Sequence, residues 1–256
     1  MILDRFRLDE KVAIVTGGGR GIGEGCALAF AEMGAHVVCA ARTPEQIEAV
    51  AEKVRASGSR ALAVPCDVMQ TDQLEGLVER TAREFGRIDI LVNNAGGSPP
   101  KPALETSERM FERAFHFNVT TAFTLSRLVV PHMRAAGGGS IVNISSAAGR
   151  LVQSGFAAYG TAKAALSFLT RNLGAEFAPE VRVNAIGVGS VATSSLLPFL
   201  DDALREQMEA LTPMRRLGEV EDIALMALYL ASPASSWVTG KVMDVDGGTE
   251  TTNWPF

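Results

Sequence analysis

The chain has 256 residues, of which 47% are hydrophobic and 21% charged, which is enough apolar material for one large core and an ordinary charge content for a globular protein. The formal net charge of −5 and the lack of any run of Lys and Arg exclude the basic surface that nucleic acids require, so we expect no nucleic-acid partner. The cysteines are too few for a disulfide framework and lie apart in apolar segments, which indicates buried thiols in a reducing compartment: Cys26, Cys39 and Cys66.

No segment approaches the ~20 uninterrupted apolar residues of a membrane-spanning helix, and the first residues, 1–7, contain no apolar signal core. We therefore expect a cytoplasmic protein with no membrane partner. The histidines His36, His116 and His132 lack the spacing of metal ligands, and no cluster of Cys, His and carboxylates accompanies them. We expect no metal site.

Short apolar runs rich in β-formers alternate with longer helical segments along the chain. The predicted strands cover residues 12–16, 36–41, 61–66, 88–92, 140–145, 181–186 and 242–245. The first predicted helix follows a glycine-rich turn and ends near residue 33. Further helices are predicted over 44–56, 71–85, 107–135 and 156–178, and in pieces from 194 to 231. We place a bend of the longest helix near Pro131.

This alternation of strands and helices predicts right-handed crossovers and an α/β fold. We expect a single doubly wound Rossmann domain over residues 1–256, with a mainly parallel seven-stranded sheet and helices on both faces.

The first predicted strand runs into a glycine-rich turn, residues 16–23, and then directly into a helix. A dinucleotide pyrophosphate needs close backbone approach, which glycines allow, and a helix N-terminus, which supplies free N–H groups and partial positive charge. The sequence therefore predicts cofactor contacts from Gly17, Gly19, Arg20, Gly21, Ile22 and Gly23.

The end of the second predicted strand bears on the choice of cofactor. An acidic residue about 20 positions after the glycines would bind the ribose 2′-hydroxyl of NAD. The chain has Ala41 followed by Arg42 at this point and no carboxylate. The forked guanidinium of Arg42, helped by Arg20, would bind a 2′-phosphate, so we predict NADP(H) rather than NAD(H). The alternative is that both arginines are solvated surface residues.

Tyr159 and Lys163 are four residues apart on a predicted helix and share one face. A tyrosine could exchange a proton with a carbonyl or alcohol oxygen, but its ordinary pKa is about 10. A lysine ammonium one turn away and the positive ring of an oxidised nicotinamide would both favour the phenolate. Tyr159 could therefore act as the general acid/base of an oxidoreductase, but a Tyr and a Lys one helical turn apart are common, and it is the other motifs of the chain that favour this role.

Several motifs follow one another in a characteristic order. The glycine spacing T-G-x-x-x-G-x-G is followed by Asn-Asn-Ala-Gly at 93–96, Asn118, Ser145-Ser146 and the pair Tyr159 and Lys163. Over the whole chain this pattern resembles the short-chain dehydrogenase/reductase family.

The resemblance implies roles for further residues. Ser146, with Ser145 as the competing candidate, would bind the substrate oxygen, and Asn118 would complete a proton relay with Lys163. Asp67 matches a position that contacts adenine in the family, although it could equally cap a helix, and Thr193 would hold the nicotinamide carboxamide. Besides the glycine turn and Arg42, the implied cofactor contacts are Asp67, Val68, Asn94, Ala95, Gly96, Tyr159, Lys163, Gly189, Val191 and Thr193.

The same resemblance places a substrate lid at about 190–215. Val188 replaces the proline that many relatives carry before it, and we expect a somewhat looser start to the lid. The lid's apolar residues suit a bulky hydrophobic substrate, although some must pack on the body: Leu196, Leu197, Phe199, Leu200, Met208, Leu211 and Met214. Residues 97–102 would form the opposite wall.

Within the family the chain is most similar to bacterial 7α-hydroxysteroid dehydrogenases, notably over 93–102 and in the Arg-Arg-Leu-Gly run at 215–218. That subgroup carries the acid that selects NAD, which this chain lacks, so the steroid substrate does not carry over. A 3-oxoacyl thioester is the other substrate that the family suggests. A different class of function, a catalytically idle NADP-binding sensor or scaffold, would predict damage among Asn118, Ser146, Tyr159 and Lys163.

The run Val-Asp-Gly-Gly at 245–248 resembles the terminal strand that packs against another subunit in tetrameric members of the family. The tail continues through Trp254, Pro255 and Phe256, and aromatic residues at a chain end would be poorly covered on a monomer. We predict a homotetramer with this tail near an interface or a neighbouring pocket.

Overall fold

The computed structural model describes residues 1–194, 196–197 and 200–254. Its centre is one seven-stranded sheet in which every neighbouring pair is parallel, in the order β3-β2-β1-β4-β5-β6-β7. The strands are β1 Val12–Thr16, β2 His36–Ala41, β3 Ala61–Pro65, β4 Ile90–Asn93, β5 Gly139–Ile144, β6 Val181–Val188 and β7 Val242–Val245. The predicted doubly wound fold is confirmed.

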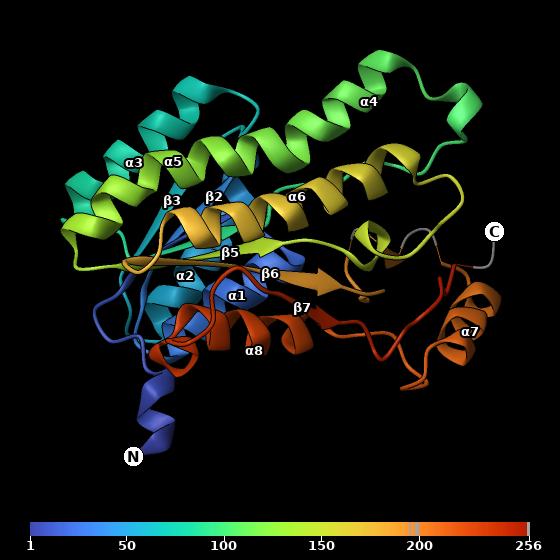
Figure 1. Cartoon of the computed structure of the whole chain (residues 1–256). Helices are drawn as coiled ribbons and strands as arrows, with labels where there is room; N and C mark the ends of the chain where they lie inside the picture. The colour runs from blue at the N-terminus through green and yellow to red at the C-terminus, as the bar shows by residue number, and fades with distance from the viewer. Residues whose placement is uncertain (195, 198–199, 255–256) are drawn as a thin grey trace.

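Helices cover both faces of this sheet (Figure 1). On one face lie α1 Gly21–Glu32, α2 Pro44–Ala56 and α8 Val220–Ala231. On the other lie α3 Thr71–Phe85, α5 Thr121–Ala135 and α6 Ala157–Glu176, with α4 Glu108–Phe115 continuing the line of α5 beyond the sheet. The short α7 Asp202–Leu211 stands apart near the C-terminal end of the chain. None of the described helices is long and apolar enough to cross a membrane.

The core has two halves because alternate residues of a strand point to opposite faces of a sheet. Ala13 and Val15 of β1 pack in a cluster with residues of α1 and α8, whereas Val12 and Ile14 pack in a second cluster with residues of α3 and α5. All five residues of β1 are buried, as expected of a central parallel strand covered on both faces.

The order of the strands reverses between β1 and β4. The chain leaves β1 toward β2 and β3 on one side and returns to β4 on the other, so β1 and β4 are neighbours although two strands separate them in sequence. A crevice opens beyond the carboxyl ends of strands at such a point, which is where ligands bind in sheets of this kind.

The long helix predicted over 107–135 is interrupted. A π-helical turn, His116–Thr120, separates α4 from α5, and α5 continues through Pro131. The bend near Pro131 stays a prediction, and the irregularity in hydrogen bonding lies at 116–120. Such a turn adds a residue to the helix locally and is frequent at functional sites. It contains Asn118.

Candidate active site

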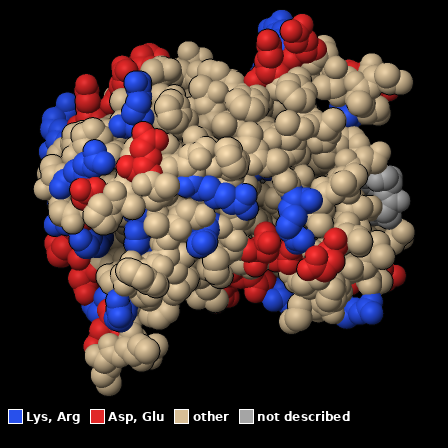
Figure 2. Space-filling view, viewed as in Figure 1, with Lys and Arg blue, Asp and Glu red and all other residues tan. Residues whose placement is uncertain are grey.

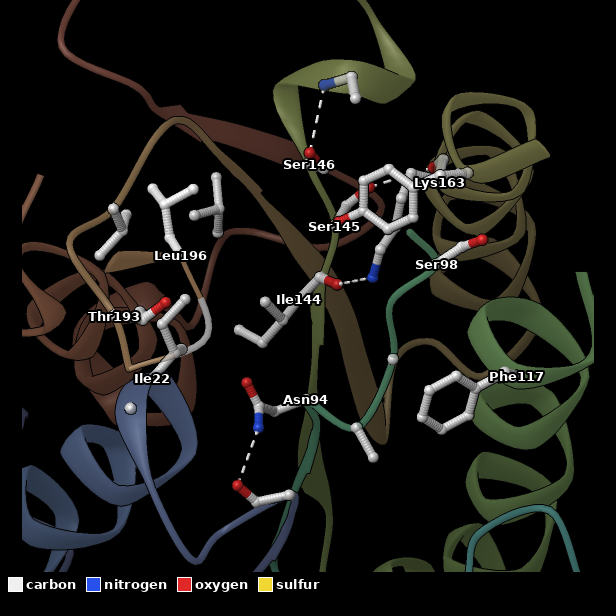
Figure 3. A pocket seen from close by; sticks show the side chains of 18 of the residues that line it. Ile22, Asn94, Ser98, Phe117, Ile144, Ser145, Ser146, Lys163, Thr193 and Leu196 are labelled. Carbon is white, nitrogen blue, oxygen red and sulfur yellow. Dashed lines mark hydrogen bonds between the residues drawn. The ribbon is translucent and has the colours of Figure 1, made fainter. Parts of the chain in front are cut away.

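A cavity of about 950 Å³ lies at the carboxyl edge of the sheet. It runs from the glycine turn after β1, past the ends of β2 to β6, to the C-terminal residues near Trp254. Figure 3 shows part of it, with Ile22, Thr193 and Leu196 on one side and Lys163 and Ser98 on the other. Its volume lies at the upper end of the ordinary range for small-molecule sites.

Several glycines of the turn stand where a side chain would be strained or would clash. Gly17 and Gly21 have φ angles of 63° and 54°, in the left-handed region that glycine adopts without strain. A Cβ on Gly23 would lie 2.3 Å from the carbonyl oxygen of Gly17, and one on Gly19 would lie 2.9 Å from Cβ of Gln46. The turn therefore presents bare backbone at the N-terminus of α1, an arrangement that fits the pyrophosphate of a dinucleotide.

Asn94 fastens this turn to the end of β4. Its Nδ2 donates to the carbonyl oxygens of Thr16, at 2.9 Å, and Gly17, at 3.2 Å. In return the hydroxyl oxygen of Thr16 accepts from the backbone N–H groups of Asn94, at 3.0 Å, and Ala95, at 3.1 Å. Ala95 and Gly96 continue the cavity wall. Thr16 was not among the predicted site residues, although its place at the end of the first strand could have indicated it.

Arg20 and Arg42 both line the cavity and are exposed. Neither side chain makes an ion pair or hydrogen bond with another residue that the structure describes, so both guanidinium groups are available to a ligand. Asp67 and Val68 line the same end. Asp67 accepts a hydrogen bond from the backbone N–H of Met69 at 3.1 Å in a turn. The N-cap position of α3 is Gln70, so the alternative role of Asp67 as a helix cap is wrong.

Of the four predicted catalytic residues, Ser146, Tyr159 and Lys163 line the cavity directly. Asn118 is buried just behind its wall. A Cβ on Gly96 would lie 2.7 Å from Oδ1 of Asn118 and 3.2 Å from Nζ of Lys163, so Gly96 separates the two side chains. Asn118 Oδ1 accepts from the backbone N–H of Gly97 at 2.8 Å.

Lys163 projects from α6 and is buried. Its Nζ donates to the carbonyl oxygen of Ile144 at 2.7 Å, the contact drawn in Figure 3, and lies 5.7 Å from the ring centroid of Tyr159. Burial lowers the pKa of Lys163 to about 8, because the charged form loses its hydration.

Burial raises the pKa of Tyr159, and a hydrogen bond with the Ser146 side chain acts in the opposite direction. The lowering expected from Lys163 is thus not seen in the free protein. The reason is desolvation, which disfavours the phenolate of Tyr159 and also makes the charged form of the neighbouring lysine less favourable.

The two serines after β5 differ in what they bind. Ser145 donates to the carbonyl oxygen of Lys163 at 3.1 Å and shares a hydrogen bond of 2.8 Å with the hydroxyl of Ser167, so its hydroxyl is engaged with α6. Ser146 accepts from the backbone N–H of Ala148 at 3.2 Å and interacts with Tyr159. The geometry favours Ser146, as the family spacing did.

Gly189, Val191 and Thr193 all line the cavity where the chain leaves β6. A Cβ on Gly189 would lie 2.6 Å from Cα of Asp246, which explains the glycine. Val188 is the last residue of β6 and pairs with Val245 of β7. The backbone N–H of Gly189 then donates to the carbonyl oxygen of Val245 at 3.1 Å, and the looser start of the lid stays a prediction.

Among the described apolar residues that were predicted for the lid, Leu196 is the one that lines the cavity. Met208 is fully buried, whereas Leu211 and Met214 are largely exposed. Phe199 lies outside the described residues. The opposite wall consists of Ser98, Pro99 and Pro100 within the predicted 97–102.

Trp254 lines the cavity of its own chain. Its ring lies 5.7 Å from that of Phe156, whose ring is in turn 5.9 Å from that of Tyr159. The premise that this aromatic residue would be poorly covered on a monomer is therefore wrong for Trp254, because it packs beside the site. Pro255 and Phe256 lie outside the described residues.

In the part of the chain that the structure describes, no group of three or more His, Cys, Asp or Glu could hold a metal ion.

The chain is similar to known proteins over almost its entire length. Residues 17–250 match the family model described as enoyl-(acyl carrier protein) reductase. An uncharacterised oxidoreductase of Mycobacterium tuberculosis is 52% identical over 97% of this chain and 95% of its own. The 7α-hydroxysteroid dehydrogenase of Escherichia coli is 40% identical over 96% of both.

Solved structures of similar proteins have the same fold as this chain. A 7α-hydroxysteroid dehydrogenase in complex with NADH and 7-oxo glycochenodeoxycholic acid has a TM-score of 0.93 at 40% identity, over 96% of this chain and 97% of that one. A short-chain type dehydrogenase/reductase from Mycobacterium marinum also has a TM-score of 0.93, at 36% identity over 98% and 99%. This chain therefore belongs to the short-chain dehydrogenase/reductase family.

Proposed function

We propose that this protein is an NADP(H)-dependent oxidoreductase that interconverts a ketone and a secondary alcohol, with Tyr159 as the general acid/base. The observation that carries the proposal is that Ser146, Tyr159 and Lys163 line the same cavity as the bare glycine turn. A bound nicotinamide would supply or accept the hydride. The glycine turn and the arginines at the ends of β1 and β2 would hold its phosphates.

The chain's own residues would manage the proton and the oxygen. In reduction, Tyr159 gives its hydroxyl proton to the oxygen that becomes the alcohol, and the Ser146 hydroxyl donates a hydrogen bond to the same oxygen as its charge develops. A raised tyrosine pKa suits the acid role, because the proton is then present at neutral pH. Lys163 lies beside the Tyr159 ring, and Asn118 lies behind Gly96. The two side chains make the environment of the tyrosine hydroxyl polar.

The proposed substrate is apolar. Leu151, Phe156, Leu196 and Trp254 line the cavity beyond the catalytic residues. Relatives named for ketone or alcohol substrates with bulky rings also support it, since the 7α-hydroxysteroid dehydrogenase is 40% identical and a tropinone reductase homolog of Arabidopsis thaliana 38% identical. A 3-oxoacyl thioester is the other candidate, and the description of the matching family model favours an acyl substrate.

The test is to offer the protein a panel of steroid ketones, bicyclic ketones and 3-oxoacyl thioesters together with NADPH. Turnover is measured as the loss of NADPH absorbance. Tyr159→Phe should lower kcat by about 100- to 10,000-fold and keep NADPH binding, measured by fluorescence titration. Tyr229→Phe is the matched control, because Tyr229 packs on Phe6 outside the cavity, and it should keep full activity. Unchanged turnover in Tyr159→Phe would overturn the proposal. NADPH binding with no turnover by the wild type would favour a sensor or scaffold.

We further propose that the protein forms a homotetramer through two different surfaces. The first is the outer face of α4, α5 and α6, where Phe111, Phe115, Phe123 and Phe168 are exposed, Phe168 by 60%. Over α5 and α6 the visible surface carries few charges (Figure 2). The second is β7, which is an edge strand of the sheet. Sedimentation at micromolar concentration should give four chains, and a monomer would contradict this proposal.

A further inference from the structure

Two aromatic side chains from distant parts of the sequence meet beside the proposed acid. Phe156 and Trp254 both line the cavity, and their rings are 5.7 Å apart. The ring of Phe156 lies 5.9 Å from that of Tyr159, so the pair extends the cavity wall outward from the reacting hydroxyl. Phe156 and Trp254 are each only partly buried, and they keep apolar surface that a ligand in the cavity can cover.

Asn253 latches the C-terminal segment beside this wall. It is buried, its side-chain oxygen accepts from the hydroxyl of Ser190 at 2.9 Å, and its Nδ2 donates to the hydroxyl of Thr212 at 3.0 Å. Ser190 follows β6 and Thr212 follows α7, so one amide joins the tail to both segments. A buried amide that is paired at both ends fixes the backbone that carries the next residue, Trp254.

Arg150 holds the same segment from the other side of the cavity. Its Nη2 donates to Oδ2 of Asp246 at 2.7 Å and to the carbonyl oxygen of Thr249 at 2.9 Å. Arg150 belongs to the stretch of chain between Ser146 and Phe156. The loop that carries one aromatic residue is thereby joined to the tail that carries the other.

The charges of the cavity lie away from this wall. Its charged lining residues within the described chain are Arg20, Arg42 and Asp67, at the end formed by the glycine turn, β2 and β3, and Lys163 beneath Tyr159. The part of a substrate that covers Phe156 and Trp254 is therefore apolar. A rigid ring loses no internal rotation when it packs on an indole, whereas an open chain must fix several bonds. The wall favours a ring.

We propose that Trp254 is a specificity-determining residue that packs on the hydrocarbon ring of the substrate and selects ring ketones over open-chain ketones. Asn253 is a positioning residue that acts through Trp254. This inference rests on the proposed oxidoreductase function and narrows its substrate, since it favours a cyclic ketone over a 3-oxoacyl chain. It follows from the contacts of the tail and not from the names of the relatives.

The kinetic experiment compares trans-2-decalone with 2-decanone, a ring ketone and an open-chain ketone of equal carbon count, as substrates with NADPH. In the wild type kcat/KM should be about 10- to 100-fold higher for the ring ketone. Trp254→Ala should lower kcat/KM for trans-2-decalone by about 10- to 100-fold, mainly through KM, and that for 2-decanone by about threefold or less. Trp254→Phe keeps a ring and should keep most of the preference.

Trp237→Ala is the matched control, because Trp237 is 99% exposed and does not line the cavity. It should change neither value. Equal losses of kcat/KM on both ketones in Trp254→Ala would overturn the role of Trp254 and leave the proposed function standing.

The latch is tested by combining substitutions. Asn253→Leu should lose the preference for the ring ketone, and Asn253→Leu with Trp254→Ala should lose no more of it than Trp254→Ala alone, because both changes remove the same wall. Losses that add would show that Asn253 supports the fold in general and would overturn its positioning role.

A binding measurement needs no turnover. The chain has two tryptophans, so Trp237→Phe leaves the fluorescence of Trp254 alone. With NADP⁺ bound no hydride is available to a ketone, and trans-2-decalone should lower acrylamide quenching of Trp254 by about twofold or more. Unchanged quenching would overturn the role of Trp254. Protection of Trp254 without NADPH-dependent turnover of either ketone would overturn the proposed function and leave the ring-binding wall standing.

Discussion

Nζ of Lys163 and the carbonyl oxygen of Ile144 are 2.7 Å apart, and this hydrogen bond ties α6 to the last residue of β5 beneath the cavity. The ammonium group is buried, and no carboxylate contributes to its pKa, which burial alone lowers to about 8. The protein therefore keeps at its site a cation that would be more stable in water. Such a group is retained for function at the expense of stability.

The first prediction concerns pH and stability. In the unfolded chain Lys163 has a pKa near 10.5, so between about pH 8 and 10.5 the unfolded state binds more protons than the folded state. The contribution of Lys163 to the free energy of unfolding should rise with pH across this window, by about 3 kcal/mol in all. The free energy of unfolding of the wild type minus that of Lys163→Met, from urea titrations at several pH values, isolates this contribution.

The contradicting result would be a difference between the wild type and Lys163→Met that stays flat from pH 8 to 10.5. Lys163→Met should also be more stable than the wild type at pH 7, because it buries no charge, and inactive on every ketone. Lys241→Met, a substitution at a lysine outside the cavity, provides the control.

The second prediction concerns the clamp between Asn118 and Gly97. Oδ1 of Asn118 accepts from the N–H of Gly97 at 2.8 Å, and its Nδ2 donates to the carbonyl oxygens of Gly97, at 3.1 Å, and Ala114, at 2.8 Å. Asn118→Ala would leave these groups unpaired and should cost about 1–3 kcal/mol of stability. Because the clamp holds the segment next to Lys163, kcat should fall more than KM rises.

Asn184→Ala is the matched control for this clamp. Asn184 is also fully buried, donating to Val238 at 2.8 Å and accepting from Lys241 at 3.1 Å, but it does not line the cavity. It should lose comparable stability in urea unfolding while keeping kcat. A kcat of Asn118→Ala equal to that of Asn184→Ala would show that the clamp is only structural.

The third prediction concerns cofactor choice. Arg42→Leu removes a guanidinium that no described residue engages, and should lower kcat/KM for NADPH about 10- to 100-fold with little effect on NADH. Ala41→Asp should act in the same direction, since its carboxylate would repel a 2′-phosphate and accept from a 2′-hydroxyl. Arg83→Leu removes an exposed arginine of α3 outside the cavity and should change neither value. A higher kcat/KM with NADH in the wild type would refute the NADP(H) assignment.

The arrangement of the fold was predictable because its signals are local. Strand β1 occupies the predicted residues 12–16, since a buried central strand is a short apolar run that a glycine turn ends. Tyr159 and Lys163 share a face of α6 because four residues nearly complete one helical turn. The chemistry of these two residues did not follow from their spacing, because such pairs are common in helices, and was predicted only from their order with the glycine turn, Asn118 and Ser146.

What could not be predicted depends on contacts between distant segments. The π-helical turn at Asn118 serves hydrogen bonds to Gly97, in another loop, and no local pattern marks it. The raised pKa of Tyr159 comes from burial that only the assembled site creates. The tail that contains Trp254 was expected near an interface or a neighbouring pocket, because nothing in its sequence indicates that Trp254 packs on Phe156.

The last prediction concerns Gly23, where the fold leaves no space for a methyl group. A Cβ there would lie 2.3 Å from the carbonyl oxygen of Gly17 and 2.6 Å from Nδ2 of Asn94. Both are parts of the same hydrogen-bonded turn, since Asn94 donates to Gly17 at 3.2 Å, so relief of the clash must displace the turn. Gly23→Ala should therefore bind NADPH at least 10-fold more weakly and lose about 1–3 kcal/mol of stability.

Gly76→Ala makes the same chemical change where nothing opposes it. Gly76 is an exposed residue in the interior of α3, and a Cβ there meets no atom within 4 Å. Alanine is the better helix former, so this variant should gain about 0.5–1 kcal/mol and bind NADPH as the wild type does. Fluorescence titration and urea unfolding of both variants decide the matter. Equal NADPH affinity in Gly23→Ala and Gly76→Ala would mean that the turn does not hold the cofactor, because a displaced phosphate turn cannot keep its contacts.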